Sequence, residues 1–190
     1  QILWFVIRRL IAMKEHELHN YKLVLQYEGI RYNGWQKQKN QENTIQEVVE
    51  NAVFDGTGER VEVIGSGRTD AGTHAMGQVA NVKLGQDLEP ERLMDNINKH
   101  LPSDIKILEC EKVDNRFHAR LNAKAKTYMY TLCVGKKPDV FNRRTVLHYC
   151  ADLDVNAMKK AAEYLKGEHD FMSFCSNKRT KKSTVRKIYD

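Results

Sequence analysis

The sequence of residues 65–75 is GSGRTDAGTHA, in which one carboxylate, Asp70, stands between an arginine and a histidine and glycine recurs on both sides. Glycine adopts backbone conformations that other residues avoid, so this spacing predicts a tight loop between two strands. The apolar pattern of residues 61–64 ends before Asp70, and that of residues 79–82 begins after it. The Asp70 carboxylate is therefore expected to lie in a loop, where it is available for chemistry.

The elements predicted around this loop form one structural unit, whose pattern begins again later in the chain. Polar and apolar residues alternate over residues 21–27, as in a half-buried strand. Thr44 and Glu47 have the spacing of a capping box, and the apolar residues that follow recur at helical spacing. Gly56 is expected to end this helix. A strand at residues 60–64 then leads into the loop.

The elements after the loop complete the unit. Strands are predicted at residues 78–84 and 105–108, and a helix begins at Pro90 and stops before Pro102. The order strand, helix, strand, strand, helix, strand is that of a ferredoxin-like unit, an α+β arrangement in which two helices cover one face of an antiparallel sheet. The other face of the sheet is expected to stay open.

The same pattern starts again and is left incomplete. Residues 124–134 alternate as a strand, residues 154–167 predict a helix, and residues 184–189 predict a strand. A second complete unit would need further elements. The sequence thus predicts three parts: an N-terminal extension (residues 1–20), a first ferredoxin-like unit with the loop (residues 21–115), and the start of a second, incomplete unit (residues 116–190).

Composition limits the class of protein. The chain has 190 residues, 41% of them hydrophobic and 29% charged, and its net charge of +6 favours a polyanionic partner. Its 4 cysteines form no CxxC pair, which predicts reduced thiols in a cytoplasmic protein and no zinc site. Residues 1–12 are too short to span a bilayer, so no membrane anchor is expected, and Met13 is expected to be the natural start.

The run GSGRTDAGTHAMGQVANV at residues 65–82 resembles the active-site signature of the TruA-type tRNA pseudouridine synthases. Four further stretches fit that family in the same order: YEGIRYNGW (27–35), FHAR (117–120), AKTYMY (125–130) and GEHDFMSF (167–174). The resemblance implies a pseudouridine synthase fold of ferredoxin-like repeats and a tRNA substrate modified in its anticodon stem-loop. It also implies a homodimer.

Pseudouridine forms when the base of a uridine leaves the ribose at N1 and rejoins it through C5. A carboxylate nucleophile suits this reaction, since it can attack the sugar or add to the uracil ring and then leave, without a metal or cofactor. By resemblance, Asp70 is that nucleophile. From the residues alone, an aspartate that caps an Asx turn is the alternative.

Two neighbours of Asp70 carry charge or can gain it. Arg68 is close enough along the chain to favour the ionised carboxylate, and it can also contact an RNA phosphate or fill the space of a flipped uridine. An ordinary surface arginine is the alternative. His74 is interpreted as a structural residue that bonds the loop backbone, more than as a general base.

The substrate-binding candidates lie on both sides of the loop. By resemblance, Tyr128 stacks on the flipped uracil and helps to remove its C5 proton, while an interior sheet tyrosine is the alternative. Lys126 is predicted on the same strand face as Tyr128. The other candidates, chosen for charge, aromatic character or resemblance, are Arg31, Trp35, His118, Arg120 and Arg179.

The sequence therefore predicts an enzyme that isomerises uridine to pseudouridine in tRNA. The alternative is an RNA-binding fragment of the same fold that does not turn its substrate over. The intact motif around Asp70 argues against the alternative, and the incomplete second unit argues for it.

Overall fold

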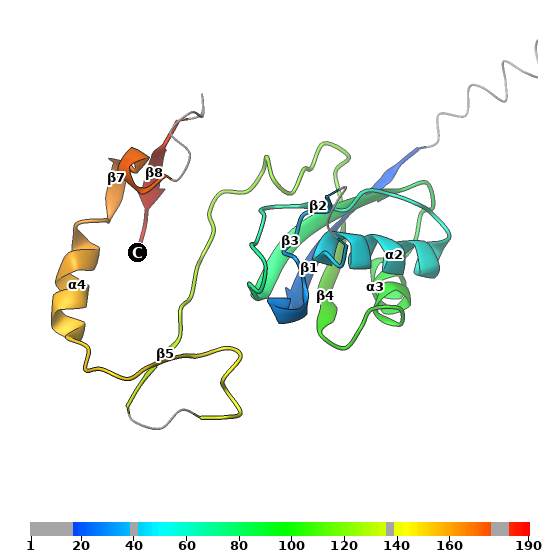
Figure 1. Cartoon of the computed structure of the whole chain (residues 1–190). Helices are drawn as coiled ribbons and strands as arrows, with labels where there is room; N and C mark the ends of the chain where they lie inside the picture. Colours follow the sequence, from blue (N-terminus) through cyan, green and yellow to red (C-terminus); the bar gives the residue numbers. More distant parts are fainter. Residues whose placement is uncertain (1–16, 39–41, 136–138, 176–182) are drawn as a thin grey trace, which may run out of the picture. The chain divides into compact units, whose positions relative to one another are not determined.

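The computed structural model describes residues 17–38, 42–135, 139–175 and 183–190. The chain divides into a larger unit that ends at Met129 and a smaller unit that begins at Tyr130 (Figure 1). This division falls later than residue 115, where the sequence placed the end of the first unit. The expectations for residues 1–16, including the start at Met13, lie outside the described residues.

The larger unit contains a sheet of four antiparallel strands in the order β2-β3-β1-β4 (Figure 1). The strands are β1 (His19–Tyr27), β2 (Ile64–Gly65), β3 (Ala75–Leu84) and β4 (Ile105–Val113). Leu23 in the central strand β1 lies opposite Ala80 of β3 and Cys110 of β4. This strand order, with one helix before β2 and one before β4, is ferredoxin-like, so the predicted α+β fold is confirmed for this unit.

Two helices cover one face of this sheet. Thr44 caps α2 (Ile45–Thr57), because its side-chain oxygen accepts the N–H of Glu47 at 3.4 Å as the capping box predicts. Pro90 begins α3 (Pro90–Asn98), whose Leu93 and Ile97 are buried. Both helices share one core with alternate residues of β1, which are Tyr21, Leu23, Leu25 and Tyr27.

Some boundaries differ from the prediction. The strand expected at residues 60–64 is reduced to Ile64–Gly65, because only these residues pair with β3. Helix α2 continues past Gly56 and ends at Thr57, since Gly58 has the left-handed backbone (φ +79°) that closes a helix. A short 3-10 helix, η1 (Gly29–Arg31), follows β1.

The smaller unit consists of short elements. Strands β5 (Leu132–Val134) and β6 (Leu147–Tyr149) pair in parallel, and β7 (Gly167–Asp170) pairs antiparallel with β8 (Val185–Ile188). Between them lie α4 (Val155–Glu163), which has no buried residue, and the 3-10 helix η2 (Met172–Phe174).

The strand predicted at residues 124–134 is wrong over most of its length. Only Leu132–Val134 forms a strand, and residues 124–130 are exposed without a hydrogen-bonded ladder. Alternation alone predicted a strand there, but a strand needs a neighbour to pair with its backbone groups. In the described part of the chain, no helix has the length and hydrophobicity required to cross a membrane.

Candidate active site

The predicted loop connects β2 to β3, and its first residues are held by the start of β3. The N–H of Ser66 donates to the carbonyl oxygen of Val79 at 2.7 Å, and its hydroxyl donates to Gln78 Oε1 at 3.0 Å. Gln78 Nε2 returns a hydrogen bond to the carbonyl oxygen of Gly67 at 2.6 Å. The backbone before Asp70 is therefore fixed by side chains as well as by the sheet.

The segment after β1 packs closely against the rest of the loop. The N–H of Trp35 donates to the carbonyl oxygen of Thr69 at 3.0 Å, and the N–H of Gly72 donates to the carbonyl oxygen of Tyr32 at 3.3 Å. Gly34 has a φ of +79°, and a Cβ atom there would lie 2.5 Å from the carbonyl oxygen of Thr69. Glycine is required at this position both for its backbone angle and for this approach.

Trp35 lies beneath the loop. Its side chain is 1% exposed, and a Cβ atom on Gly65 would lie 2.5 Å from its indole ring. Its ring centroid is 6.2 Å from that of Tyr27, whose hydroxyl lies 2.9 Å from Thr69 Oγ1. The expectation that Trp35 contacts the substrate does not fit this burial, and the side chain supports the loop from inside.

Asp70 lies exposed on the loop. Its carbonyl oxygen accepts the N–H of Thr73 at 3.1 Å, and Gly72 supplies the positive φ (+79°) of this turn. Among the described residues, no hydrogen bond to the Asp70 carboxylate closes an Asx turn, so the turn is formed by the backbone. The Asp70 side chain is thus accessible to solvent.

Arg68 does not pair with Asp70 in the way the sequence suggested. Its Nε–H donates to Gln36 Oε1 at 3.2 Å, and no ion pair within the described residues joins it to Asp70. The side chain of Arg68 is exposed. Closeness in sequence therefore did not produce an ion pair between these two residues.

A second cation reaches the loop from residues distant in sequence. The Lys126 ammonium lies over Gly67, so that a Cβ atom on this glycine would collide with Lys126 Nζ. Tyr128 is 71% exposed, and no hydrogen bond or ring contact among the described residues joins it to the loop. The structure therefore brings Lys126 to the loop, while Tyr128 lies in the exposed segment that follows it.

Two buried asparagines attach the segment around Phe117 to the sheet. Asn20 Nδ2 donates to the carbonyl oxygens of Asp114 at 3.0 Å and Phe117 at 2.9 Å. Asn81 Oδ1 accepts the N–H of Ala119 at 2.9 Å, and Asn81 Nδ2 donates to Asn20 Oδ1 at 3.1 Å. Sequence reasoning missed this pair, although amides in an otherwise apolar strand pattern are a signal of such a role.

His118 and Arg120, both in the FHAR stretch, differ in their exposure and hydrogen bonding. His118 Nδ1 accepts the N–H groups of Arg120 at 3.2 Å and Leu121 at 3.4 Å, so this ring organises the local turn. Arg120 is exposed. The described contacts thus give His118 a structural role and leave Arg120 at the surface.

The remaining predicted RNA contacts lie on the surface or outside the described residues. Arg31 is 72% exposed, and its guanidinium lies 3.3 Å from the Asp104 carboxylate, which also accepts the Tyr32 hydroxyl at 2.6 Å. Burial, followed by the bond to Asp104, raises the pKa of the Tyr32 hydroxyl. Arg179 lies outside the described residues.

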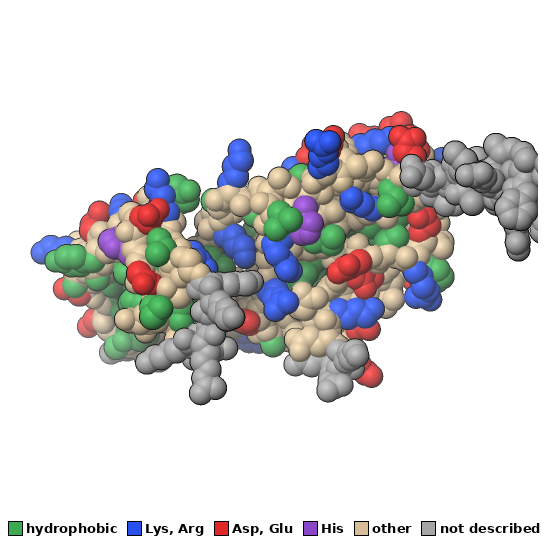
Figure 2. All heavy atoms as spheres, turned by 90° about the horizontal axis from the view of Figure 1, so that it is seen from above, with side chains coloured by type: hydrophobic (Ala, Val, Ile, Leu, Met, Phe, Trp, Pro, Cys, Tyr) green, Lys and Arg blue, Asp and Glu red, His purple; other side chains and the backbone are tan. Residues whose placement is uncertain are grey.

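The surface carries mixed charges. Figure 2 shows many Lys and Arg side chains on the face drawn, with Asp and Glu side chains between them. Within residues 17–38, 42–135, 139–175 and 183–190, no group of His, Cys, Asp and Glu side chains could hold a metal ion.

Comparison with known protein families gives a match that covers the loop and its sheet. The chain matches the family described as tRNA pseudouridine synthase over residues 23–122 and 161–190, which include the loop and the sheet around it. The chain belongs to the tRNA pseudouridine synthase family. The resemblance seen in the sequence is confirmed, and members of this family are isomerases.

Individual tRNA pseudouridine synthases are similar along most of the chain. "tRNA pseudouridine synthase A 2" of Bacillus cereus (strain ATCC 14579) is 44% identical over 172 residues, which are 90% of this chain and 70% of the relative. "tRNA pseudouridine synthase A" of Acetivibrio thermocellus is 42% identical over 173 residues, 91% of this chain and 70% of the relative. The corresponding protein of Bacillus sp. (strain KSM-64) is 45% identical over 172 residues, again 90% of this chain and 70% of the relative.

Proposed function

We propose that this tRNA pseudouridine synthase uses Asp70 as the nucleophile on a uridine in the anticodon stem-loop of tRNA. The observation that supports this role is an exposed carboxylate on a loop whose backbone is fixed from both sides, by Gln78 and by residues 29–35. A rigid loop holds the attacking oxygen in one place, and effective molarity depends on that geometry. The anticodon stem-loop is proposed from the family resemblance.

The reaction conserves every atom of the substrate. Asp70 attacks C1′ of the ribose or adds to the uracil ring, the bond between C1′ and N1 breaks, and the base turns. A bond then forms between C1′ and C5, Asp70 departs, C5 loses its proton and N1 gains one. No oxidant, reductant or metal is needed, because the product is an isomer of the substrate.

Three other side chains have proposed roles in this reaction. Arg68 helps to displace the uridine from its stack, since a long cationic side chain beside the nucleophile can occupy the vacated space. Tyr128 stacks on the flipped uracil and assists removal of the C5 proton. Lys126, which lies over Gly67, contacts an RNA phosphate beside the loop.

A homodimer is proposed from the same resemblance, with one tRNA touching both subunits. Sedimentation of the protein with and without an anticodon stem-loop RNA tests this. A monomer at concentrations that saturate the RNA would overturn it.

The substitution Asp70→Asn tests the nucleophile. It keeps the size of the side chain but replaces a carboxylate with a poorly nucleophilic amide, so pseudouridine formation should fall below detection while RNA affinity remains. Pseudouridine mapping of tRNA measures the product, and RNA binding is measured in parallel. Asp55→Asn, an exposed carboxylate on α2, is the matched control and should keep its activity.

The outcomes separate the enzyme from its alternative. If the parent chain binds RNA but makes no pseudouridine, the chain is a non-catalytic RNA-binding fragment. If Asp70→Asn makes pseudouridine at a substantial fraction of the parent rate, another residue is the nucleophile.

A further inference from the structure

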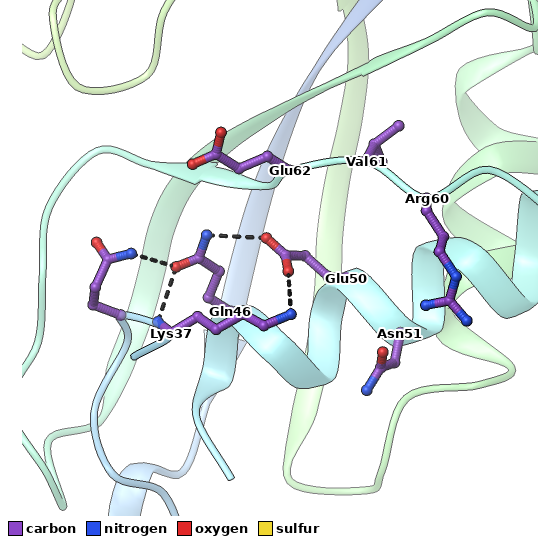
Figure 3. Close-up of a pocket in the computed structure, with 8 residues that line it drawn as sticks. Lys37, Gln46, Glu50, Asn51, Arg60, Val61 and Glu62 are labelled. Carbon is purple, nitrogen blue, oxygen red and sulfur yellow. Dashed lines mark hydrogen bonds and ion pairs between the residues drawn. The ribbon is translucent and has the colours of Figure 1, made fainter. Parts of the chain in front are cut away.

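A polar network, buried at its far end, lies beside the loop and is not used by the reaction described above. It joins the segment after Trp35 to two residues one turn apart on α2 (Figure 3). Gln36 Nε2 donates to Gln46 Oε1 at 2.7 Å, and Gln46 Nε2 donates to Glu50 Oε1 at 3.0 Å. These residues form one wall of a hollow of about 500 Å³.

The network ends on Arg68. Gln36 Oε1 accepts the Nε–H of Arg68 at 3.2 Å, so the hydrogen bonds run continuously from Arg68 through Gln36 and Gln46 to Glu50. Residues from the catalytic loop, from the segment after β1 and from α2 are thereby connected. Arg68 lies 32 positions from Gln36 along the chain, so only the fold creates this contact.

The orientation of each glutamine amide in this network is fixed by its partners. A carboxylate accepts hydrogen bonds and donates none, so Glu50 requires the NH₂ group of Gln46 to face it. Gln46 Oε1 then faces the opposite way, where it accepts from Gln36 and also from the backbone N–H of Lys37 at 3.0 Å. Gln36 must in turn present its oxygen to Arg68. The Glu50 carboxylate and the Lys37 backbone N–H together thus set the acceptor that the arginine meets.

The far end of the network is rigid. Gln46 is 4% exposed, and the side chain of Glu50 is 13% exposed. Glu50 Oε2 pairs with Lys37 Nζ at 3.2 Å, and Glu50 Oε1 accepts the backbone N–H of Val63 at 3.2 Å. These partners offset the cost of burying the charge.

We propose that Gln36, Gln46 and Glu50 are positioning residues that hold the Arg68 guanidinium for displacement of the target uridine. The inference rests on the proposed role of Arg68 in that step. Because Arg68 is held by Gln36, the network also keeps this cation from pairing with the Asp70 carboxylate. The network acts through Arg68 and touches no substrate itself.

Isosteric removal of the amides tests the proposal. Gln36→Met keeps the side-chain length but removes the acceptor for Arg68, and Gln46→Met breaks the network one step further away. Each should lower kcat on a stem-loop with a paired target uridine by about threefold to tenfold, which is the effect of losing one typical hydrogen bond, with KM changed less than about twofold. Gln38→Met, an exposed glutamine outside the network, is the control and should leave kcat unchanged.

Two readouts distinguish positioning from general structural damage. In an Arg68→Ala background, Gln36→Met should cause no further loss, because the residue it positions is absent. On RNA whose target uridine is already unpaired, the loss from Gln36→Met should shrink together with that from Arg68→Ala. An additive loss in the double variant, or an equal loss on both RNAs, would overturn the proposal.

A substitution at Glu50, the carboxylate end of the network, provides an independent test. Glu50→Gln keeps the shape, but an amide cannot accept at both ends: with its oxygen toward Gln46 and the Val63 N–H, its NH₂ group meets the Lys37 ammonium. The network loses one partner at this end, so kcat should fall, although less than for Gln36→Met. Thermal unfolding of each variant shows whether it is folded. Should Gln46→Met not fold, Gln36→Met at the partly exposed end still decides the question. Activity retained by Asp70→Asn would refute the proposed nucleophile without bearing on these double-variant results.

Discussion

At the scale of single residues, burial and partners assign roles that residue type alone leaves open. Trp35 and Tyr128 are both aromatic residues in family motifs, yet one is 1% exposed and the other is 71% exposed. Arg68 and Lys126 are both cations near the loop, yet one is bonded to Gln36 and the other lies over Gly67. Chemical type indicates what a side chain can do, and its surroundings decide what it does.

The thiol of Cys110 provides a pH-dependent prediction at this scale. Burial, with a smaller effect of Glu111, raises the pKa of this thiol from 9.0 to about 12. A raised pKa means that the fold favours the neutral thiol, so its contribution to stability is complete below pH 9 and is lost as the pH rises toward 12. Within that window, unfolding should become easier as the pH rises.

The same residue should resist alkylation. At about pH 8 to 9, Cys110 should react with iodoacetamide much more slowly than Cys150, because the thiolate is the reactive form and Cys150 is exposed. Mass spectrometry of peptides at successive times measures both rates, and a Cys110→Ser variant identifies the slow peptide. Equal rates in the folded protein would contradict the assigned burial.

At the scale of elements, the loop before β3 and the segment after β1 form a single packed structure. Backbone hydrogen bonds join Trp35 to Thr69 and Gly72 to Tyr32, and the indole of Trp35 lies below Gly65. Apart from Gly65 at the end of β2, neither segment has regular structure of its own over these residues. Each is fixed by the other, so damage to one is expected to displace Asp70 in the other.

A pair of glycine substitutions tests this mutual packing. Gly34 and Gly58 both have a φ of +79°, but a Cβ atom on Gly34 meets the Thr69 carbonyl oxygen at 2.5 Å, whereas one on Gly58 meets nothing within 4 Å. Gly58→Ala should cost about 1 to 2 kcal/mol from backbone strain alone. Gly34→Ala adds a clash with backbone and should cost more, about 3 kcal/mol.

Chemical denaturation measures both costs, and pseudouridine formation should fall at least about tenfold in Gly34→Ala while Gly58→Ala keeps its rate. Equal losses of stability and activity in the two variants would show that the loop does not depend on the segment after β1.

At the scale of the whole molecule, the net charge of +6 and the exposed cations suit a polyanionic substrate. Two of these cations, Lys124 and Lys126, are exposed on the segment that leads from the larger unit. Acidic side chains lie between the basic ones on the face in Figure 2, so net charge alone does not mark the binding surface.

The salt dependence of tRNA binding tests whether this segment contacts phosphates. Replacing Lys124 and Lys126 with glutamine should weaken binding and reduce the slope of log affinity against log salt by about one for each phosphate that the protein no longer neutralises. In the control variant, Lys99, just after α3, and Lys106 on β4 are replaced with glutamine. This control should reduce the slope of log affinity against log salt less. The modified uridine should stay the same in both, and a slope that is unchanged in the first variant would place the RNA elsewhere.

The sequence by itself determined the order of elements in the first unit, the family and the loop. Local rules were sufficient for these, since the Thr44 cap, the Pro90 start and the alternation in β1 depend on residues close together in the chain. They failed at residues 124–130, where alternation predicted a strand without a pairing partner.

Only the tertiary structure decided which distant residues meet at the loop and at the sheet beside it. Gln36 reaches Arg68, Lys126 reaches Gly67, and Asn81 holds Ala119, in each case across a long stretch of sequence. The strand order β2-β3-β1-β4 places the segment after β1 beside the loop after β2, although these strands are separated by a whole helix in the chain. Contacts of this kind depend on how the sheet assembles, and no local pattern of residues encodes them.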